Sequence, residues 1–416
     1  MSGVIAVAGS TRLKLENARR ASAALARLSA KQKHDLLIEM ADQIEASSPK
    51  ILEANEEDIR RSNLSGAMRD RLLLDPARIS AMAGSIRDVA ALADPVHEVL
   101  EEWTRPNGLR IRKVRVPLGV IGIVYESRPN VTVDAAVLAF KTGNAVVLRG
   151  GKEAAASNEV LADLLASVPG VPEGAIALLD ASTRETVQEL ITARGLVDVV
   201  IPRGGSALIA HVVENALVPV IETGAGNCHI FVDDSADLAM ATEIVLNAKI
   251  QRPSVCNAAE KLVVHRNLAR VFVPQIVSRL AEANVEVRGD EETMRLAPAV
   301  TPAAEPDWGE EYLRLCIAIR IVGGIGEAIE HINRYSTKHS EAIVTANEEN
   351  AQKFLQLVDS AAVYWNASTR FTDGGEFGFG AEMGVSTQKL HCRGPFALKE
   401  LTSTKYQIVG SGQVRS

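Results

Sequence analysis

Residues 116–154 read VPLGVIGIVYESRPNVTVDAAVLAFKTGNAVVLRGGKEA, and the predicted fold rests on this stretch. Apolar runs at 119–125 and 145–151 flank helical spacing near 134–140, and a second helical segment follows near 153–166. The alternation then continues through apolar runs at 175–180, 197–205 and 218–224 and helical segments near 184–193 and 207–215. Repeated strand–helix units of this kind predict an α/β fold with a doubly wound parallel sheet covered on both faces.

The flanking segments predict three further parts. Residues 15–62 have apolar positions at helical spacing and predict a pair of long helices. Alternating apolar and basic residues at 106–116 follow an Asn-Gly turn and predict an exposed β-hairpin, an element that often serves oligomer contacts. From residue 236 another α/β stretch predicts a second lobe, and the segment from residue 366 predicts loops that end in an edge strand.

The composition narrows the class of protein. The 416 residues are 47% hydrophobic and 23% charged, which is typical of a folded chain with more than one domain. The net charge is −7 and no basic block is present, which argues against nucleic acid as a partner. The longest strongly apolar stretch, Leu118–Tyr125, is too short to cross a bilayer, and the N-terminus lacks the pattern of a secretory signal. We therefore expect a cytoplasmic protein with no membrane partner.

The cysteines are candidates for chemistry. Cys228, Cys256, Cys316 and Cys392 are widely spaced, so free thiols are expected rather than a disulfide framework. No C-x-x-C pair and no H-E-x-x-H is present, and no metal is predicted. Cys256 is expected between a polar loop and a following helix, whose N–H groups favour a thiolate. A cysteine in such a place is more often a small buried apolar residue, and the other three keep that interpretation.

Glycines and cations at strand ends are the candidates for binding a dinucleotide. No G-x-G-x-x-G opens a helix, so the usual Rossmann fingerprint is absent. Instead, Gly204, Gly205 and Ser206 in IPRGGSALI open a helix after a strand, where backbone N–H groups can hold a pyrophosphate. Arg149 and Lys152 follow the strand of AVVLRGG and suit a phosphorylated ribose. A steric use of glycine and a solvated turn are the alternative interpretations, and the steric one is the more frequent for glycine.

Six blocks of the sequence match motifs of known proteins: residues 116–154, 201–206 (IPRGGS), 221–233 (IETGAGNCHIFVD), 247–260 (NAKIQRPSVCNAAE), 333–345 (NRYSTKHSEAIVT) and 366–398 (the tail from NASTRF to GPFAL). Together they resemble those of the aldehyde dehydrogenase superfamily and, within it, the γ-glutamyl phosphate reductase family. They are spread over almost the whole length of the chain. The match of QRPSVCNA to the family's nucleophile motif identifies Cys256 as the nucleophile.

The resemblance implies a fold, a division into domains and a reaction. The implied fold is aldehyde dehydrogenase-like, with an NADPH-binding domain at 1–104 and 118–235. Residues 236–365 would form the catalytic domain, and 105–117 with 366–416 an oligomerisation hairpin, loops and a strand. The implied reaction is the NADPH-dependent reduction of L-glutamyl 5-phosphate to L-glutamate 5-semialdehyde and phosphate through a Cys256 thioester, the second step of proline biosynthesis.

The resemblance also implies roles for individual residues. Lys152 stands where many NAD-preferring relatives have an acidic residue, which implies NADPH, and Glu311 in DWGEEYL matches the segment that touches the nicotinamide ribose. Glu222 falls where relatives keep a base that activates water, and here it either tunes the thiol or supports the loop. Arg128 and Arg370 are expected to bind the carboxylate and the phosphate of the substrate. The weaker candidates for substrate binding are Asn130, Ser368 and Thr369.

Several alternatives stay open. Ser127 stands where hydrolytic relatives place an oxyanion-holding asparagine, so the backbone N–H of Cys256 is the first substitute donor. An inter-lobe salt bridge is the alternative role for Arg128 and Arg370. A hydrolytic NAD(P)-dependent aldehyde dehydrogenase and a non-catalytic protein that retains the fold are the alternative functions. A homo-oligomer is expected, and a separate glutamate 5-kinase is the expected metabolic neighbour, because the chain has no room for a fused kinase.

Overall fold

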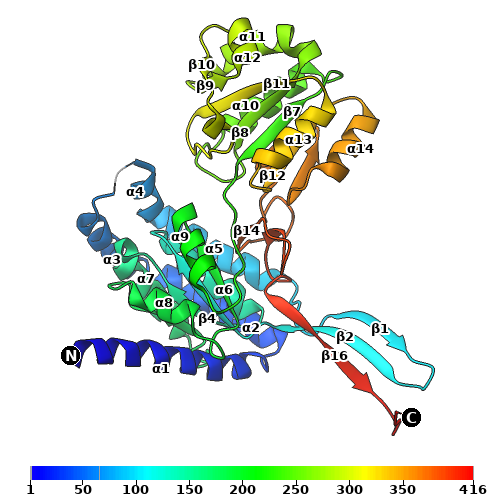
Figure 1. The fold of residues 1–416 in the computed structure, drawn as a ribbon. Coiled ribbons are helices and arrows are strands. Elements are labelled where there is room, and N and C mark those ends of the chain that lie inside the picture. The colour runs from blue at the N-terminus through cyan, green and yellow to red at the C-terminus, as the bar shows by residue number, and fades with distance from the viewer. Residues whose placement is uncertain (1, 65, 416) are drawn as a thin grey trace. The chain divides into compact units, whose positions relative to one another are not determined.

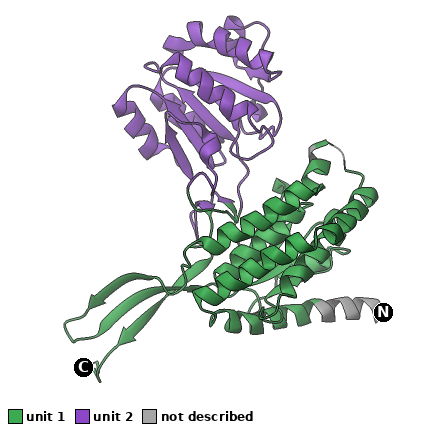
Figure 2. Ribbon diagram, turned by 180° about the vertical axis from the view of Figure 1, so that it is seen from behind, with its two compact units in different colours: residues 1–222, 378–384, 396–416 green, residues 223–377, 385–395 purple. Residues whose placement is uncertain are grey.

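The computed structural model describes residues 2–64 and 66–415, and their contacts divide the chain into two compact units (Figure 2). The first unit contains the chain up to Glu222, Gly378–Gly384 and the segment from Phe396 onward, and the second contains Thr223–Phe377 and Val385–Pro395. The predicted NADPH-binding domain, 1–104 and 118–235, includes β7 (Cys228–Val232), whereas in the structure β7 pairs within the sheet of the second unit. The functions assigned to the domains stay predictions.

Helices form the N-terminal part of the first unit (Figure 1). They are α1 (Ser2–Leu25), α2 (Ala30–Ala46), α3 (Ser48–Arg61), α4 (Gly66–Leu72) and α5 (Pro76–Ala91). The predicted pair of helices over 15–62 is wrong, because that stretch contains three. Ser29 begins α2 with a capping box to Gln32, and Ser47 separates α2 from α3, which has a proline in its first turn.

A four-stranded parallel sheet in the order β5-β4-β3-β6 is the centre of the first unit. Its strands are β3 (Val120–Tyr125), β4 (Ala145–Arg149), β5 (Ile176–Leu178) and β6 (Val199–Arg203). The helices that follow them are α6 (Pro129–Lys141), η1 (Lys152–Ala154), α7 (Ala155–Ala166), α8 (Glu185–Ile191) and α9 (Ser206–Asn215). The predicted doubly wound sheet is confirmed. The run at 218–224 makes only one bridge, between Val200 and Val220, because Pro219 has no N–H for a ladder.

The strand order creates a switch point between β3 and β6. From β3 the chain moves outward through β4 to β5 and then returns to the other side of β3. Right-handed crossovers put α6 and α7 on one face and α8 on the other, where α8 packs against α1. Ligands of such sheets bind beyond the carboxyl ends of the strands at the switch point.

A separate antiparallel sheet in the first unit consists of β1 (Val99–Thr104), β2 (Arg110–Pro117) and β16 (Thr402–Val409) (Figure 1). Gly108, in the turn between β1 and β2, has a φ of 86°, which suits glycine. The rings of Trp103 and Tyr406 meet edge to face, with centroids 6.1 Å apart. The predicted hairpin and the C-terminal edge strand are confirmed, and their role in oligomers stays a prediction.

A seven-stranded parallel sheet in the order β10-β9-β11-β8-β7-β12-β13 is the centre of the second unit. After β7 its strands are β8 (Ala259–His265), β9 (Glu286–Gly289), β10 (Thr301–Pro302), β11 (Cys316–Val322), β12 (Ser340–Val344) and β13 (Ala362–Trp365). Its helices are α10 (Leu238–Ile250), α11 (Arg266–Glu282), α12 (Glu291–Leu296), η2 (Glu305–Trp308), α13 (Ile325–Tyr335), α14 (Glu348–Leu357) and η3 (Thr369–Phe371). The short strands β14 (Gly384–Ser386) and β15 (Gly394–Phe396) pair with each other. The predicted second α/β lobe is confirmed.

All strands of the seven-stranded sheet run in one direction. The loops that precede β7, β8 and β12 therefore lie along the same edge, which we call the amino edge. Apolar side chains of β7, β8 and β11 pack with α10 and α11 in one large core cluster. In the described part of the chain, no helix has the length and apolarity needed to span a membrane.

Candidate functional site

Cys256 lies on the amino edge, in the turn between α10 and β8, and its side chain is half-buried. The helix predicted to follow Cys256 is absent, because residues 259–265 form β8. Every residue of β8 is buried, and its Leu-Val-Val run is typical of a strand in the middle of a parallel sheet. Helix N–H groups therefore do not account for the reactivity predicted for this thiol.

The segment Gly226–Cys228 packs against the backbone of Cys256. A Cβ added to Gly226 would lie 1.4 Å from the carbonyl oxygen of Cys256 and 2.7 Å from its Cα, so only glycine fits there. Two residues later, the Cys228 thiol donates a hydrogen bond to the same carbonyl oxygen over 3.2 Å. The position of the predicted nucleophile thus depends on a neighbouring loop.

Four hydrogen bonds hold the segment Gly226–Cys228 in place. The Gly226 N–H donates to Oε1 of Glu311 over 2.6 Å, and the Asn227 N–H donates to Oγ1 of Thr337 over 2.9 Å. The Asn227 amide donates to the carbonyl oxygens of Trp308 and Tyr335, each over 2.8 Å. Burial raises the pKa of Glu311. In the structure Glu311 supports the loop beside Cys256, and its predicted contact with the nicotinamide ribose stays a prediction.

On the other side of the thiol, Asn257 binds the segment that contains η3. The Thr369 hydroxyl donates to the Asn257 carbonyl oxygen over 2.7 Å, and the Asn257 amide donates to the carbonyl oxygens of Arg370 and Thr372. Ser368 begins η3, because its Oγ accepts the N–H of Arg370 over 3.3 Å. The structure therefore brings Ser368, Thr369 and Arg370, all predicted to bind substrate, to the loop of Cys256.

The Arg370 guanidinium lies near the thiol. Its Nε donates to Oε1 of Gln251 over 2.8 Å. Burial and then Arg252 lower the pKa of Arg370, whereas the negative charges of Asp373 and Cys256 raise it. Since the attraction between Arg370 and Cys256 is mutual, the guanidinium also stabilises a thiolate at Cys256.

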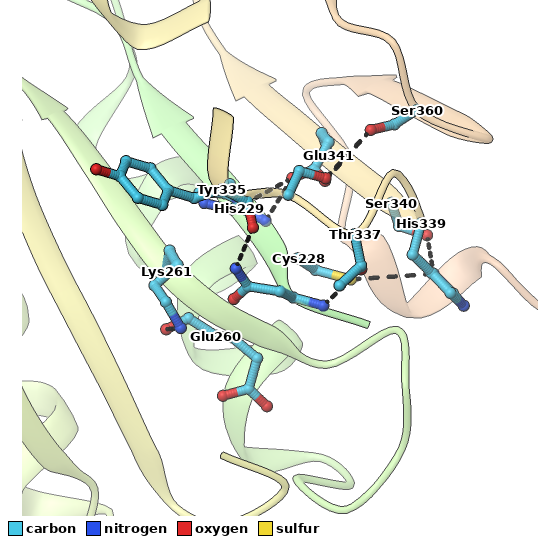
Figure 3. Close-up of polar contacts among 12 residues, drawn as sticks. Cys228, His229, Glu260, Lys261, Tyr335, Thr337, His339, Ser340, Glu341 and Ser360 are labelled. Atoms are coloured by element: carbon cyan, nitrogen blue, oxygen red, sulfur yellow. Dashed lines mark hydrogen bonds and ion pairs between the residues drawn. The ribbon is translucent and has the colours of Figure 1, made fainter. Parts of the chain in front are cut away.

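Behind the thiol, the second unit buries an ion pair. Nζ of Lys249 lies 3.1 Å from Oε2 of Glu260, and both side chains are fully buried. Burial raises the pKa of Glu260 to about 7 and lowers that of Lys261 to about 8. Lys261 donates to the carbonyl oxygen of Glu310 over 2.8 Å and lies over the Tyr312 ring (Figure 3 labels Glu260 and Lys261). These contacts fix the segment from which Glu311 reaches Gly226.

A second buried pair, His229 and Glu341, joins β7 to β12 (Figure 3). Oε2 of Glu341 accepts the backbone N–H of His229 over 2.6 Å and lies 3.1 Å from its Nδ1. Burial lowers the pKa of His229 to about 3 and raises that of Glu341 to about 8, so both are neutral near pH 7. The pair therefore links the two strands without a net charge.

In the first unit, the glycine turn lies at the carboxyl ends of β3 and β6. A Cβ on Gly204 would lie 2.7 Å from Cδ of Glu126 and from Cδ2 of Leu208, whereas Gly205 has room. The Gly205 N–H donates to Oε1 of Glu126 over 3.0 Å, and Ser206 begins α9 at the surface. A glycine turn at the switch point fits a dinucleotide phosphate, and the carboxylate of Glu126 occupies one of the N–H donors.

The two predicted cofactor cations differ in their surroundings. Arg149 donates to the carbonyl oxygens of Gly150 (2.9 Å) and Thr183 (2.6 Å), and burial lowers its pKa. Lys152 is exposed at the start of η1 and has no hydrogen bond or ion pair with the described residues. Arg149 therefore orders the loop after β5, whereas the Lys152 ammonium is available to a ligand.

Of the residues predicted for catalysis and substrate binding, three belong to the first unit, whereas the others, which include Cys256 and Arg370, belong to the second. Arg128 precedes α6, the Asn130 amide donates to Oδ2 of Asp134 over 3.2 Å, and Glu222 is half-buried at the end of the unit. The roles assigned to Arg128, Asn130 and Glu222 stay predictions.

One group of side chains among the described residues has the spacing of metal ligands. Asp233, Asp234 and His265 bring ligand atoms within 4.8 Å of one another at the carboxyl ends of β7 and β8. Oδ2 of Asp233 already accepts from Thr345 and Asn350, and Nδ1 of His265 accepts the N–H that begins α11. These contacts explain two of the three residues as strand-end caps, and the prediction of no metal stays a prediction.

The comparisons with known proteins first define a class. The model of the aldehyde dehydrogenase family matches residues 8–313. An acetylating aldehyde dehydrogenase from Geobacillus thermoglucosidasius, at 16% identity and a TM-score of 0.69 over 99% of both chains, has the same fold. The two parallel sheets are thus those of an aldehyde dehydrogenase fold.

Closer relatives narrow the class. A γ-glutamyl phosphate reductase of Koribacter versatilis is 65% identical over 97% of this chain and 100% of its own. One of Caldanaerobacter subterraneus subsp. tengcongensis is 55% identical over 97% and 99%. The crystal structure of a γ-glutamyl phosphate reductase from Thermotoga maritima matches with a TM-score of 0.96 at 48% identity, over 98% of this chain and 100% of that one. The chain therefore belongs to the aldehyde dehydrogenase family and, within it, to the γ-glutamyl phosphate reductases.

Family membership confirms the resemblance and the fold predicted from the sequence blocks. The chain is an oxidoreductase that acts on a small molecule with a nicotinamide cofactor. Sequence analysis missed Gly226, Asn227, Cys228 and Asn257 as supports of the thiol, and Glu126 as the partner of Gly205. A signal was present, because polar residues directly before the buried strands β7, β8 and β12 must lie together on one edge.

Proposed function

We propose that the chain reduces L-glutamyl 5-phosphate to L-glutamate 5-semialdehyde and phosphate with NADPH, the second step of proline biosynthesis. The observation that carries the proposal is the half-buried Cys256 thiol, held from one side by Gly226–Cys228 and from the other by the segment that contains Arg370. Relatives at 53–65% identity over nearly the whole chain bear the name of this activity, which supports the choice of substrate.

Cys256 is the nucleophile in this mechanism. Its thiolate forms a bond to the acyl carbon of the substrate, and the bond from that carbon to the phosphate oxygen breaks, so phosphate leaves with the electron pair and a thioester remains. The nicotinamide cofactor supplies the hydride that reduces the thioester carbon. The N–H of Cys256 donates to the oxygen of the reduced carbon, and cleavage of the carbon–sulfur bond releases the aldehyde and the thiolate.

Arginines bind the substrate in this proposal. The half-buried Arg370 guanidinium is anchored to Gln251 on the loop of the nucleophile, and it can accept a carboxylate or a phosphate in a bidentate contact. Arg128 and Asn130 are assigned to substrate binding as well. Ser368 and Thr369 act through the backbone that carries Arg370, because their hydroxyls already bind Arg370 N–H and Asn257.

The cofactor binds the first unit in this proposal. Gly204, Gly205 and Ser206 receive the pyrophosphate at the start of α9, after Glu126 has released the Gly205 N–H. The exposed Lys152 attracts the 2′-phosphate that distinguishes NADPH from NADH. Arg149 orders the loop after β5 beside this site.

The two glutamates near the site have supporting roles here. Glu311 holds Gly226 and thereby Cys256, in addition to its predicted contact with the nicotinamide ribose. Glu222 is assigned a role in tuning the thiol or supporting its loop, since water activation would release an acid instead of an aldehyde. A hydrolytic aldehyde dehydrogenase is the rival function, and it has no use for phosphate.

Phosphate dependence separates the two functions. With glutamate semialdehyde and NADP⁺, reduced cofactor should accumulate in steady state only when inorganic phosphate is present, because phosphate must displace the acyl group from Cys256. The Cys256→Ala variant should be inactive, and Cys316→Ala, which changes a fully buried thiol on β11 of the same unit, should be active. Steady turnover without phosphate would overturn the assignment.

The proposal also covers the oligomeric state, the cellular location and the metabolic neighbour of the enzyme. We assign the exposed sheet of β1, β2 and β16, with Tyr406 58% and Ile408 61% exposed, to contacts in a homo-oligomer. The enzyme works in the cytoplasm beside a glutamate 5-kinase that makes its substrate. Sedimentation of Tyr406→Asp/Ile408→Asp tests the contact surface, because an unchanged oligomer would exclude it.

A further inference from the structure

Cys228 has no assigned role, yet it touches the nucleophile's backbone. It is the first residue of β7 and is fully buried. Its Sγ lies 3.2 Å from the carbonyl oxygen of Cys256 and 4.0 Å from Nδ1 of His339 (Figure 3 labels Cys228 and His339). The thiol proton therefore has two neighbouring atoms that could accept it, the Cys256 carbonyl oxygen and Nδ1 of His339.

The direction of the neighbouring hydrogen bonds decides where that proton goes. Oγ of Ser340 donates to Oγ1 of Thr372 over 2.6 Å, so its only proton is used. Nδ1 of His339 lies 2.8 Å from the same Oγ, and it must therefore be the donor in that contact. A protonated Nδ1 cannot accept from Cys228, and the thiol donates to the Cys256 carbonyl instead.

Burial keeps Cys228 in the form that can donate. The pKa of its thiol lies well above the ordinary value, first because of burial and then because of Glu341. The S–H is therefore present throughout the pH range in which an ordinary nucleophilic thiol ionises. A protonated thiol is also a poor nucleophile, which argues against a disulfide exchange with Cys256.

The peptide after the nucleophile is held from both ends. Cys228 binds the carbonyl of Cys256, while the Asn257 side chain donates to the carbonyl of Thr372 over 2.9 Å. Thr372 is also the end of the chain of contacts from His339 through Ser340. The Cys256 carbonyl is therefore held by Cys228, and the next residue is held through a chain of contacts that runs from His339 through Ser340 and Thr372 to Asn257.

We propose that Cys228 is a positioning residue, whose S–H donates to the Cys256 carbonyl and fixes the peptide from which the nucleophile attacks. This inference rests on the proposed function in one respect, because it takes Cys256 as the nucleophile. The thiol of Cys228 does not touch substrate; it acts through the conformation of Cys256.

A pair of substitutions at one site tests the role. Cys228→Ser keeps a donor, whereas Cys228→Val fills the space without one, and Cys228→Ala removes both donor and bulk. In the phosphate-dependent assay, Cys228→Val and Cys228→Ala should lower kcat by about 3- to 10-fold, the worth of one hydrogen bond, with KM for the aldehyde within about twofold. Cys228→Ser should stay within about twofold of the parent kcat, by the same reasoning.

Two controls make the result decisive. Cys316→Ala changes another fully buried thiol of the second unit and should leave kcat unchanged. Alkylation of Cys256 by iodoacetamide, located by peptide mass mapping, should proceed at the parent rate in all Cys228 variants, which shows that the thiol is intact. Equal kcat in Cys228→Val and the parent would overturn the positioning role, and so would equal losses in the Ser and Val variants. A fully active Cys256→Ala variant would instead overturn the proposed function.

Discussion

The two parallel sheets of this chain present their candidate sites at opposite edges. In the first unit, the glycine turn and Lys152 lie beyond the carboxyl ends of β3, β4 and β6, where ligands of doubly wound sheets bind. In the second unit, Cys256 and its supports Cys228 and Ser340 lie at the amino ends of β8, β7 and β12. The candidate cofactor site therefore lies at the carboxyl edge of its sheet, as is usual for ligands of such sheets, whereas the candidate nucleophile lies at the amino edge of its own.

The difference between the edges has a physical cause in the second unit. At its carboxyl edge, Asp233 binds Thr345 and Asn350, and Asp290 begins α12, so these polar groups hold strand ends and helix starts. At its amino edge, the loops before β7 and β8 bind each other through Gly226 and Cys256. The polar groups at the carboxyl edge are thus used by the fold itself, whereas the amino edge presents the half-buried thiol of Cys256.

The largest expected effect concerns the buried ion pair behind the amino edge. Lys249→Met leaves the Glu260 carboxyl without its partner and should lower the free energy of unfolding by about 3–5 kcal/mol. Urea unfolding followed by the fluorescence of Trp308 and Trp365 in a Trp103→Phe background reports on the second unit. The double variant Lys249→Met/Glu260→Gln should recover part of the loss, and the exposed Lys353→Met should lose nothing. A loss as small as that of Lys353→Met would mean that the pair is not buried as described.

A second prediction concerns the close approach of Gly226 to Cys256. Gly226→Ala forces the Cys256 carbonyl away from a Cβ that would otherwise lie 1.4 Å from it. A displacement of that size should lower kcat by about 100-fold. Gly326→Ala is the matched control, since that glycine in α13 has no atom near its added Cβ and should leave kcat at the parent value. Parent-like kcat in Gly226→Ala would show that the loop does not position the thiol.

The third prediction uses the pKa of Glu341, which is about 8 in the folded chain against 4.5 in the unfolded one. A raised pKa contributes stability that is complete below pH 4.5 and is lost as the pH rises through 8. The pKa of His229 is lowered from 6.5 to about 3, so its contribution to stability increases as the pH rises, and it changes only below pH 6.5. Between pH 6.5 and 8, Glu341 alone of this pair changes the stability.

The Glu341→Gln variant isolates this contribution. The difference in unfolding free energy between the parent and Glu341→Gln should fall by about 1.5 kcal/mol from pH 6.5 to pH 8. Glu349→Gln, at an exposed position in the same unit, should show a constant difference from the parent. A constant difference for Glu341→Gln as well would place an ionised carboxylate at this site.

The smallest expected effect concerns the carboxyl edge of the first unit. Lys152→Glu should shift the preference for NADPH over NADH by about fivefold toward NADH, because a single exposed charge contributes about 1 kcal/mol to binding a phosphate. The measurement is the ratio of kcat/KM for the two cofactors. Lys353→Glu, at an exposed position on α14, is the control. If the ratio does not move, Lys152 is surface charge only.

Sequence periodicity predicted the fold where apolar runs decide it. The buried strands β3, β4 and β6 lie where residues 119–125, 145–151 and 197–205 indicate them. Prediction failed where a single residue decides the backbone, as at Pro219, which stops a strand, and at Ser47, which splits a predicted helix. It also placed a helix after Cys256, although the apolar run at 261–265, which it set between two helices, belongs to β8.

The candidate site divides in a similar way. Cys256 could be found from its motif, and Arg370, Ser368 and Thr369 from the tail block, because motifs report residues that lie near one another in related chains. The sequence held a signal that Gly226 and Cys228 lie on the same edge as Cys256, but their contacts with it could not be predicted, since these depend on the register of β7 beside β8. A shift by one residue in that register would point the Cys228 thiol away from Cys256.

The central claim is that the thiol at the amino edge carries the acyl group. When the enzyme is mixed with glutamate semialdehyde and NADP⁺ in the absence of phosphate, we expect a single burst of reduced cofactor, one equivalent per chain. Acid quenching and peptide mass mapping should then find the glutamyl group on Cys256 as a thioester, which phosphate would discharge. Continuous turnover without phosphate, or an acyl group on Cys228, Cys316 or Cys392, would contradict the account.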